Sequence, residues 1–255
     1  MLKTVEKLTL IRQGFSDHPG MDVAVSHAAL SAAARGDLES TFRLHVPGRV
    51  LAFGRADRVQ SGYQRAVRVA RAHRYEPVER LAGGRAAVLH ESTLAFSWAL
   101  PDSNPRAGIR QRFEVISGVV ATALKSLGVD ARVGEIPGEY CPSEWSVNIG
   151  GRVKVMGVGQ RLVRGAAHIG GVVVVDGARD IRNVLIPVYR ALKLDWDPRT
   201  TGALADRSPG LDNKKVTRAI IAALSERYDV HRGELPDQVV QEAKTLLPGH
   251  LPKVA

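Results

Sequence analysis

Apolar residues recur along the chain at two spacings, one typical of α-helices and one typical of β-strands. In residues 21–34, Met21, Val25 and Ala28 follow the helical spacing, and Gly36 ends the run. The segments that we predict to be helical are 21–34, 60–73, 109–127, 178–192, 214–228 and 236–246. Short apolar runs between turn residues predict strands at 8–11, 40–45, 49–53, 77–80, 94–100, 146–149, 153–163 and 168–175.

The order of these elements predicts the fold class. Strands follow one another in pairs and do not alternate strictly with helices, which favours an α+β fold over a doubly wound parallel sheet. We therefore expect mixed β-sheets flanked by helices. The pattern changes near Thr200, where a loop leads into the last two predicted helices. Residues 1–200 are predicted to form the main domain, and residues 201–255 a helical extension packed on it.

Composition narrows the class of protein. Hydrophobic residues make up 44% and charged residues 24%, as in soluble globular proteins, and no apolar run is long enough to span a membrane. Charges among the first eight residues argue against a secretory signal. A single cysteine, Cys141, excludes an internal disulfide and fits a reducing cytoplasm, which is the expected location.

The net charge of +10 indicates an anionic partner. The basic residues are scattered, and aromatic residues make up only 5% of the chain. A nucleic-acid-binding surface needs clustered basic residues and aromatic stacking, so we favour an acidic protein or a phosphate-bearing ligand over nucleic acid.

A glycine loop stands between two predicted strands, at Arg80-Leu81-Ala82-Gly83-Gly84-Arg85-Ala86-Ala87-Val88-Leu89-His90. Gly83 and Gly84 permit positive φ and a close approach of the backbone to a ligand. Arg80 and Arg85 bracket them with guanidinium groups suited to a carboxylate or phosphate. An ordinary tight turn between two surface arginines would show the same residues.

Two later stretches carry further polar candidates on strands. Lys154 precedes Gly157 and Gly159, which leave space for a ligand, so its charge could stabilise negative charge on an acyl or phosphoryl oxygen. The alternative is a solvated lysine at a sheet edge. His168 opens an apolar strand, where it could contact a ligand or stay a buried core residue.

Taken in order, these stretches resemble the lipoate–protein ligase and octanoyltransferase family, which shares its catalytic fold with biotin–protein ligases. Arg80–His90 is similar to the family's Arg-Arg-x-Ser-Gly-Gly-Gly-Ala-Val-x-His, with one extra alanine and with Arg85 in place of a glycine. Lys154-Val155-Met156-Gly157-Val158-Gly159-Gln160-Arg161 is close to Lys-x-x-Gly-x-Ala-Gln-Arg, and His168-Ile169-Gly170-Gly171 is near the His-x-Gly strand. The similarity runs from about Met21 to Trp196.

The resemblance implies an enzyme that attaches lipoate or octanoate to a lysine of a lipoyl carrier domain. In a ligase, ATP and Mg²⁺ activate the acid as an acyl-adenylate, and Lys154 would be the catalytic residue that holds its carbonyl or phosphate. The residues implied to bind the acyl or adenylate group are Arg80, Gly83, Gly84, Arg85, His90, Gly157, Gln160 and His168. No residue is predicted to bind a metal directly.

The implied partners are lipoyl carrier domains of 2-oxoacid dehydrogenases or the glycine cleavage H protein, with acyl carrier protein as a further candidate donor. We expect neither nucleic acid nor a membrane as a partner. Biotin is disfavoured as a substrate, because biotin enzymes use a different arginine-rich adenylate loop.

Two departures from the family pattern leave the mechanism open. Ser146 stands where ligases usually carry an acidic residue. One octanoyltransferase branch uses a cysteine in a Cys-Phe-x-x-Pro-Ser pattern, and alignment of Pro142-Ser143 places that position on Gly138, three residues before Cys141. We therefore favour ATP-dependent ligation, with acyl transfer through Cys141 as the alternative and a buried, inert Cys141 expected. A non-catalytic acyl-binding member of the fold is a further hypothesis.

Overall fold

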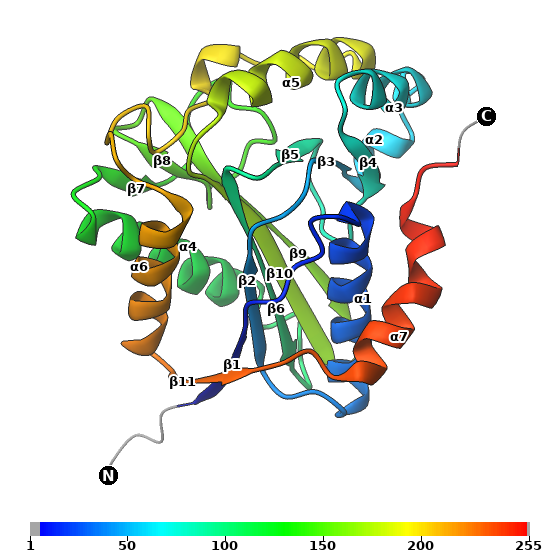
Figure 1. The fold of residues 1–255 in the computed structure, drawn as a ribbon, viewed down its shortest axis with the longest axis vertical. Helices are drawn as coiled ribbons and strands as arrows, with labels where there is room; N and C mark the ends of the chain where they lie inside the picture. The colour runs from blue at the N-terminus through cyan, green and yellow to red at the C-terminus, as the bar shows by residue number, and fades with distance from the viewer. Residues whose placement is uncertain (1–5, 254–255) are drawn as a thin grey trace.

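In the computed structural model, which describes residues 6–253, an eight-stranded sheet runs through the middle of the molecule (Figure 1). Its strands, in spatial order, are β11 (Asp229–Gly233), β1 (Lys7–Ile11), β2 (Thr41–His45), β6 (Thr93–Pro101), β10 (Ala166–Val174), β9 (Val153–Val163), β8 (Val147–Ile149) and β7 (Ala131–Val133). Strand β1 pairs in parallel with both of its neighbours, and the other pairs are antiparallel. The predicted α+β class with mixed sheets is confirmed.

One face of this sheet is apolar. Because side chains alternate along a strand, Phe42, Phe96 and Ile169 point to the same side. Helices α4 (Ile109–Ser126) and α6 (Asn213–Ser225) cover that side and bury it in the largest hydrophobic core of the described chain.

The opposite face carries small and polar residues. Paired positions on β2, β6 and β10 hold Arg43, Ser97 and Gly170, and the neighbouring positions include His45 and His168. Helix α1 (Pro19–Arg35) packs against β6 and β10 on this side, and α7 (Asp237–Leu246) packs on α1. Gly170 and Ser97 are small, so this face leaves space under the elements that cover it.

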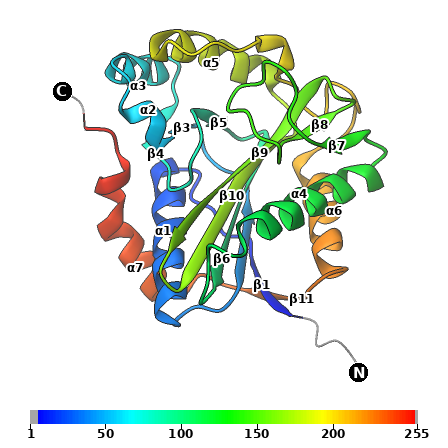
Figure 2. The ribbon, with the colours of Figure 1, turned by 180° about the vertical axis from the view of Figure 1, so that it is seen from behind.

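A second, smaller sheet stands beyond the N-terminal end of α1 (Figures 1 and 2). It consists of β4 (Glu76–Glu79), β3 (Val50–Phe53) and β5 (Ala87–Leu89). Helices α3 (Tyr63–Ala72) and α5 (Ala178–Leu192) cover its outer side and form a separate core with it. The remaining short helices are α2 (Arg55–Arg58), η1 (Pro198–Thr200) and η2 (Leu247–His250).

The C-terminal segment is joined to the rest of the fold at three places. Strand β11 pairs with β1, α6 packs on α4, and α7 packs on α1. The two helices were predicted from the sequence, but β11 between them was not. Its residues Asp229–Gly233 are polar and largely exposed, so they show no apolar alternation.

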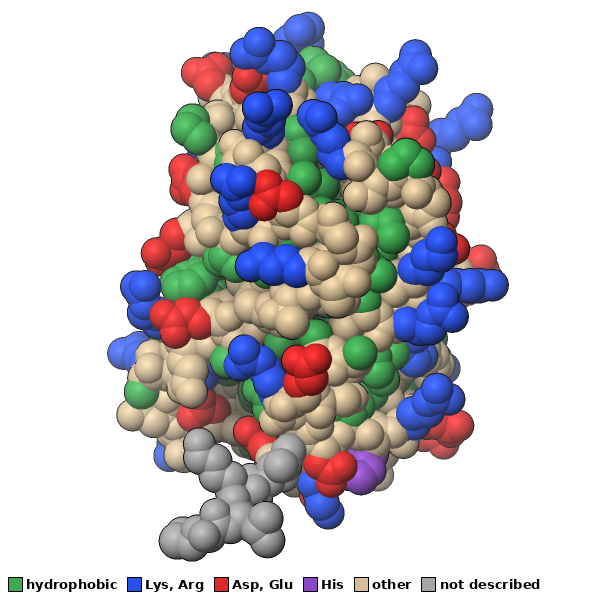
Figure 3. Space-filling view, turned by 90° about the vertical axis from the view of Figure 1, so that its left-hand side faces the viewer, with side chains coloured by type: hydrophobic (Ala, Val, Ile, Leu, Met, Phe, Trp, Pro, Cys, Tyr) green, Lys and Arg blue, Asp and Glu red, His purple; other side chains and the backbone are tan. Residues whose placement is uncertain are grey.

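Basic residues are scattered over the drawn surface, as they are along the sequence. On the face drawn in Figure 3, Lys and Arg side chains lie among Asp and Glu and do not gather into one patch. None of the helices within residues 6–253 is both long and apolar enough to cross a membrane.

Candidate active site

A cavity of about 120 Å³ lies between the small-residue face of the large sheet and the smaller sheet. Its walls are mostly apolar, with Ala52 and Leu89 from the smaller sheet and Gly157 and Val172 from the large one. The ionisable residues that line it are Asp22, His45, Arg80, Tyr140, Cys141, Lys154 and His168. An apolar pocket with a few converging polar groups is the usual form of a small-ligand site.

Glycines in the large sheet make room for two of these polar side chains. A Cβ atom on Gly157 would lie 3.3 Å from Cε of Lys154, and a Cβ on Gly170 would lie 2.8 Å from Nε2 of His168. Each polar side chain therefore lies over a glycine of its own sheet and reaches along the cavity floor. Gly157 and Gly170, which follow Lys154 and His168 in the sequence, thus leave room for these two side chains.

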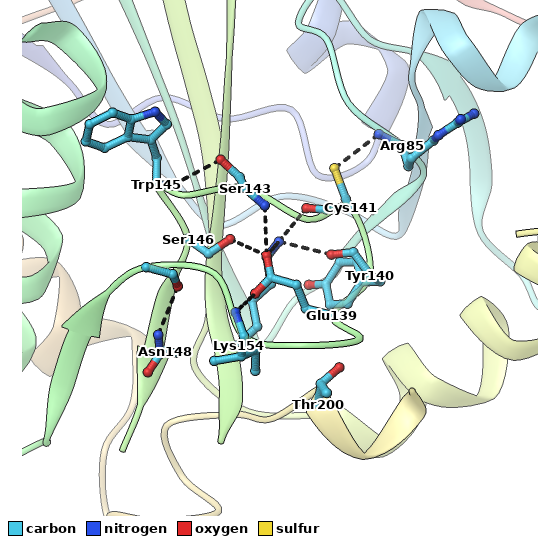
Figure 4. A network of polar contacts seen from close by, with 12 residues as sticks. Arg85, Glu139, Tyr140, Cys141, Ser143, Trp145, Ser146, Asn148, Lys154 and Thr200 are labelled. Carbon is cyan, nitrogen blue, oxygen red and sulfur yellow. Dashed lines mark hydrogen bonds and ion pairs between the residues drawn. The ribbon is translucent and has the colours of Figure 1, made fainter. Parts of the chain in front are cut away.

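Cys141 lies in the long loop between β7 and β8, with its backbone in the left-handed region at φ +46°. The amide N–H of Arg85 donates to its Sγ at 3.1 Å (Figure 4), and Nη2 of Arg80 lies 3.5 Å from the same atom. Gly84, at φ +96°, brings the glycine loop over the sulfur. The half-buried cysteine thus faces the cavity beneath this loop.

The surroundings of Cys141 favour the thiolate. Burial alone raises the pKa of the thiol, but the positive charges of Arg80 and Lys154 and the Arg85 amide outweigh it and lower the pKa below its ordinary value. A thiolate, not a thiol, is the nucleophile in cysteine chemistry. This position therefore has the access and the charge that a nucleophile needs.

Lys154 is fully buried in an ion pair with Glu139. Its Nζ donates to Oε1 of Glu139 at 3.0 Å and to the backbone carbonyls of Tyr140 and Cys141 at 3.0 and 2.7 Å (Figure 4). Glu139 also accepts from the Ser146 hydroxyl at 2.6 Å. The acidic group missing at Ser146 in the sequence is thus supplied by the loop that carries the cysteine.

Sequence reasoning missed Glu139. A carboxylate two positions before a lone cysteine was visible, but the irregular loop gave no periodicity that could place it against Lys154. Gly138 does not line the cavity, whereas Cys141 does.

Several residues predicted at the site do lie there. Arg80, Gly157 and His168 line the same cavity as Lys154. Gly83 lies in the loop above, and its amide donates to the backbone oxygen of Gln160 at 3.4 Å.

The side chains of three other predicted residues lie elsewhere. The Arg85 guanidinium turns away from the sulfur, as Figure 4 shows, and donates to the Ala56 carbonyl at 3.0 Å, so only its amide faces Cys141. The side chain of Gln160 points to the opposite face of the sheet, where its Oε1 accepts a hydrogen bond from Nε of Arg112 at 2.9 Å. The buried ring of His90 accepts from the amide of Ser92 in the turn before β6.

A second polar cluster lines the cavity and was not predicted from the sequence. Asp22, in the first turn of α1, forms an ion pair with Arg43 and lies 3.2 Å from Nε2 of His45. His168 is buried nearby, and burial, Arg43 and His27 lower its pKa to about 4. His168 is therefore neutral at physiological pH.

The carboxylate beside Lys154 is not available to a cation such as Mg²⁺. Mg²⁺ binds through exposed carboxylates, water and phosphate oxygens. Glu139, the carboxylate beside Lys154, is fully buried and accepts hydrogen bonds from Lys154, Ser146, Ser143 and Ile136. Residues 6–253 contain no group of three or more His, Cys, Asp or Glu residues that could hold a metal ion.

Comparison with known proteins supports the motifs found in the sequence. Residues 18–193 match the family described as the lipoyl protein ligase A/B catalytic domain. The chain belongs to this family. The resemblance inferred from the three motifs is confirmed, and so is the prediction that the chain is an enzyme of this class.

Members of this family with similar sequences carry transferase names. One from Geobacillus kaustophilus is 31% identical over 64% of this chain and 57% of its own length, and is named octanoyl-[GcvH]:protein N-octanoyltransferase. One of the same name from Bacillus velezensis is 27% identical over 88% of this chain and 75% of its own length. A lipoyl-[GcvH]:protein N-lipoyltransferase from Listeria monocytogenes is 25% identical over 66% of this chain and 63% of its own.

Solved structures of family members share the fold. Lipoate-protein ligase A bound with ATP superposes with a TM-score of 0.77 at 18% identity, covering 95% of this chain and 94% of its own. The lipoate protein ligase of Thermoplasma acidophilum gives a TM-score of 0.73 at 18% identity, covering 95% and 92%.

Proposed function

We propose that this protein is an acyltransferase that moves an octanoyl or lipoyl group onto a lysine of a lipoyl carrier domain through a thioester on Cys141. The observation that carries the proposal is the position of the sulfur. It faces the cavity, accepts a hydrogen bond from the Arg85 amide at 3.1 Å and lies beside the positive charge of Arg80. The names of the relatives, which are transferases that use GcvH, support the same chemistry.

The reaction would run in two steps that balance without ATP. The Cys141 thiolate attacks the acyl carbonyl of an N-acyl-lysine on the donor protein; a C–S bond forms, the C–N bond breaks, and the leaving amine takes up a proton. The neutral amine of the acceptor lysine then attacks the thioester. A C–N bond forms, the C–S bond breaks, the amine loses a proton, and the thiolate is regenerated.

The partners in this proposal are the glycine cleavage H protein as acyl donor and the lipoyl domains of 2-oxoacid dehydrogenases as acceptors. This choice replaces the ATP-dependent ligation favoured by the sequence. Two observations support the replacement. Glu139, which pairs with Lys154, is fully buried, and the relatives carry transferase names. Acyl carrier protein stays an alternative donor, because its thioester could acylate the same sulfur.

The test uses the purified 255-residue chain with octanoyl-H protein and an apo lipoyl domain, without ATP. We expect mass spectrometry to show transfer of the octanoyl group, and to show an acyl adduct on Cys141 that hydroxylamine removes. The Cys141→Ser variant should show neither, with transfer reduced at least about 10³-fold.

If Cys141→Ser still transfers the octanoyl group, and if the reaction needs ATP and free octanoate, the protein is instead a ligase. Binding of the acylated donor without transfer from any donor would favour a non-catalytic member of the fold.

A further inference from the structure

One side of the molecule carries an excess of positive charge. Residues 55–74, which include α2 and α3, contain six arginines and one acidic residue, so their net charge is +5, half that of the whole chain. All six arginines are exposed, and they form what we call the arginine surface: Arg55, Arg58, Arg65, Arg68, Arg71 and Arg74. The acidic residue, Asp57, is fully buried and pairs with Arg85, so it does not reach the surface.

The arginine surface has few acidic partners of its own. The exposed arginines of α3 recur every three residues along its outer face, while Tyr63, Ala66 and Ala70 are buried beneath it. Among the six, and within residues 6–253, only Arg58 forms an ion pair, with Glu79 at 3.0 Å. Guanidinium groups match the geometry of carboxylates, and an unpaired array of them attracts an acidic surface.

The arginine surface adjoins the loop that covers Cys141. Helix α2 begins directly after Gly54, where an added Cβ would lie 1.8 Å from the carbonyl oxygen of Gly84 in the glycine loop. The guanidinium of Arg85 donates to the Ala56 carbonyl in α2, and its amide donates to Sγ of Cys141. One residue of the loop therefore contacts both α2 and the nucleophile.

A protein that brings a lysine to Cys141 would contact this part of the molecule. Gly83 and Gly84 are exposed on the outside of the glycine loop, beside α2. A lysine side chain is much shorter than the domain that carries it. A domain whose lysine reaches the sulfur therefore covers the surface around the loop, and α2 is part of that surface.

The arginine surface fits a protein better than a nucleic acid. Surfaces that bind single-stranded nucleic acid combine positive charge with exposed aromatic side chains for stacking. The aromatic residues of this region, Phe53, Tyr63 and Tyr75, are instead buried. Val59, at the end of α2, is 82% exposed, more than any other large apolar side chain of residues 6–253. Arginines around an exposed apolar side chain suit an acidic protein face with an apolar centre.

We propose that the arginine surface is the docking site for an acidic face of the carrier domains, and that acyl donor and acceptor occupy it in turn. The donor presents an acylated lysine in the first step, and the acceptor presents a free lysine in the second. Both lysines must reach the sulfur of Cys141, so one docking site serves both domains. The inference rests on the proposed function, because that function makes both partners protein-bound lysines.

The test begins with a variant of the arginine surface. Arg55→Glu/Arg65→Glu/Arg68→Glu reverses three exposed charges that have no ion pair among the described residues. We expect kcat/KM for octanoyl-H protein to fall about 10²-fold, because attraction between opposite charges raises association rates by about 10–10³-fold. Added salt should slow the unmodified protein toward the rate of the variant. Acylation of Cys141 by p-nitrophenyl octanoate, which has no carrier domain, should keep its unmodified rate.

The matched control reverses three exposed arginines at the opposite end of the molecule, on α6, on β11 and in the turn between them (Figures 1 and 2). This variant, Arg218→Glu/Arg227→Glu/Arg232→Glu, has the same net charge as the first. It should retain the kcat/KM of the unmodified protein for octanoyl-H protein. Circular dichroism and thermal unfolding check that both variants are folded.

A binding measurement tests whether the two carriers share the site. Fluorescence anisotropy of labelled octanoyl-H protein should rise when the unmodified chain is added and should fall again when an apo lipoyl domain is added in excess. Simultaneous binding of both domains would overturn the shared site.

The docking site is also overturned by an unchanged kcat/KM in the arginine-surface variant, or by equal losses in the two variants. Loss of binding to a single-stranded oligonucleotide, with carrier kinetics intact, would assign the surface to nucleic acid instead. If the unmodified chain forms no acyl-Cys141, the proposed function fails, but the anisotropy experiment still reports whether the carrier docks on the arginine surface. The two failures are therefore distinguishable.

Discussion

At the residue scale, the chemistry of Cys141 depends on a balance between burial and charge. Burial acts against the thiolate, and the largest opposing influence is the positive charge of Arg80. Because the two influences oppose each other, loss of one side chain should be visible in the titration of the thiol.

We expect Arg80→Gln to raise the pKa of the Cys141 thiol, which lies below its ordinary value in the unmodified protein. The rate of alkylation by iodoacetamide, followed against pH, reports this pKa directly. The midpoint should move to higher pH in Arg80→Gln. Arg132→Gln, which changes an exposed arginine on β7 paired with Asp130, is the matched control and should leave the midpoint in place. An unshifted midpoint in Arg80→Gln would show that Arg80 does not govern the thiol.

Sequence reasoning recovered the residues that lie in motifs and missed those that depend on the shape of a loop. Lys154, Arg80 and His168 were predicted and line the cavity. Glu139 was missed, because its contacts arise within the loop before β8. No spacing rule connects such a loop to a strand lysine.

At the element scale, the glycine loop between β4 and β5 depends on one of its two central glycines. At Gly84, φ is +96°, and an added Cβ would lie 2.4 Å from Nη2 of Arg80 and 2.7 Å from Sγ of Cys141. At Gly83 the backbone is outside the left-handed region, and an added Cβ would meet nothing within 4 Å.

Gly84→Ala should therefore displace Arg80 or the sulfur and reduce formation of the Cys141 thioester about 10²-fold, since a shift of about 1 Å at a reacting group has that effect. Gly83→Ala is the matched control and should remain near the unmodified rate. Burst kinetics with p-nitrophenyl octanoate measure both. Equal rates in the two variants would contradict the role assigned to Gly84.

Most helices and strands were predicted within a few residues, because each buries one face. Helix α5 was predicted at its observed bounds, Ala178–Leu192, and Pro187 within it did not end it. Strand β7 was missed because it is short and its last two residues are exposed, and β11 because it is polar. Edge strands of this kind form through backbone hydrogen bonds, which do not require alternating hydrophobic residues in the sequence.

At the scale of the whole molecule, buried histidines link stability to pH. Burial is the first cause that lowers the pKa of His168, to about 4, and Arg43 and His27 add to it. In the unfolded chain the ordinary value of 6.5 applies, so between pH 6.5 and 4 the unfolded state binds more protons than the folded one. The contribution of His168 to the free energy of unfolding is therefore complete above pH 6.5, and it is lost as the pH falls toward 4.

For His168 alone, this loss should be on the order of 2 kcal/mol between pH 6.5 and pH 5. Urea unfolding at the two pH values measures it. His168→Gln should be less stable overall but should show a smaller difference between the two pH values. His231→Gln, at an exposed histidine of β11, should show the difference of the unmodified protein. A difference that is the same in all three proteins would exclude His168 as the source.

The pairing of β1 with β2 and β11 has a consequence for the order in which the protein folds. Thr9 lies opposite Thr41 on one side and opposite His231 on the other, so β1 pairs with one strand close to it in the sequence and with one more than 200 residues later. Contacts between residues so far apart form late, because closing a long loop costs entropy that few local contacts offset. During synthesis, the outer edge of β1 stays open until β11 has left the ribosome. We expect completion of this edge to be the slow event of folding, later than assembly of the cavity that holds the cysteine.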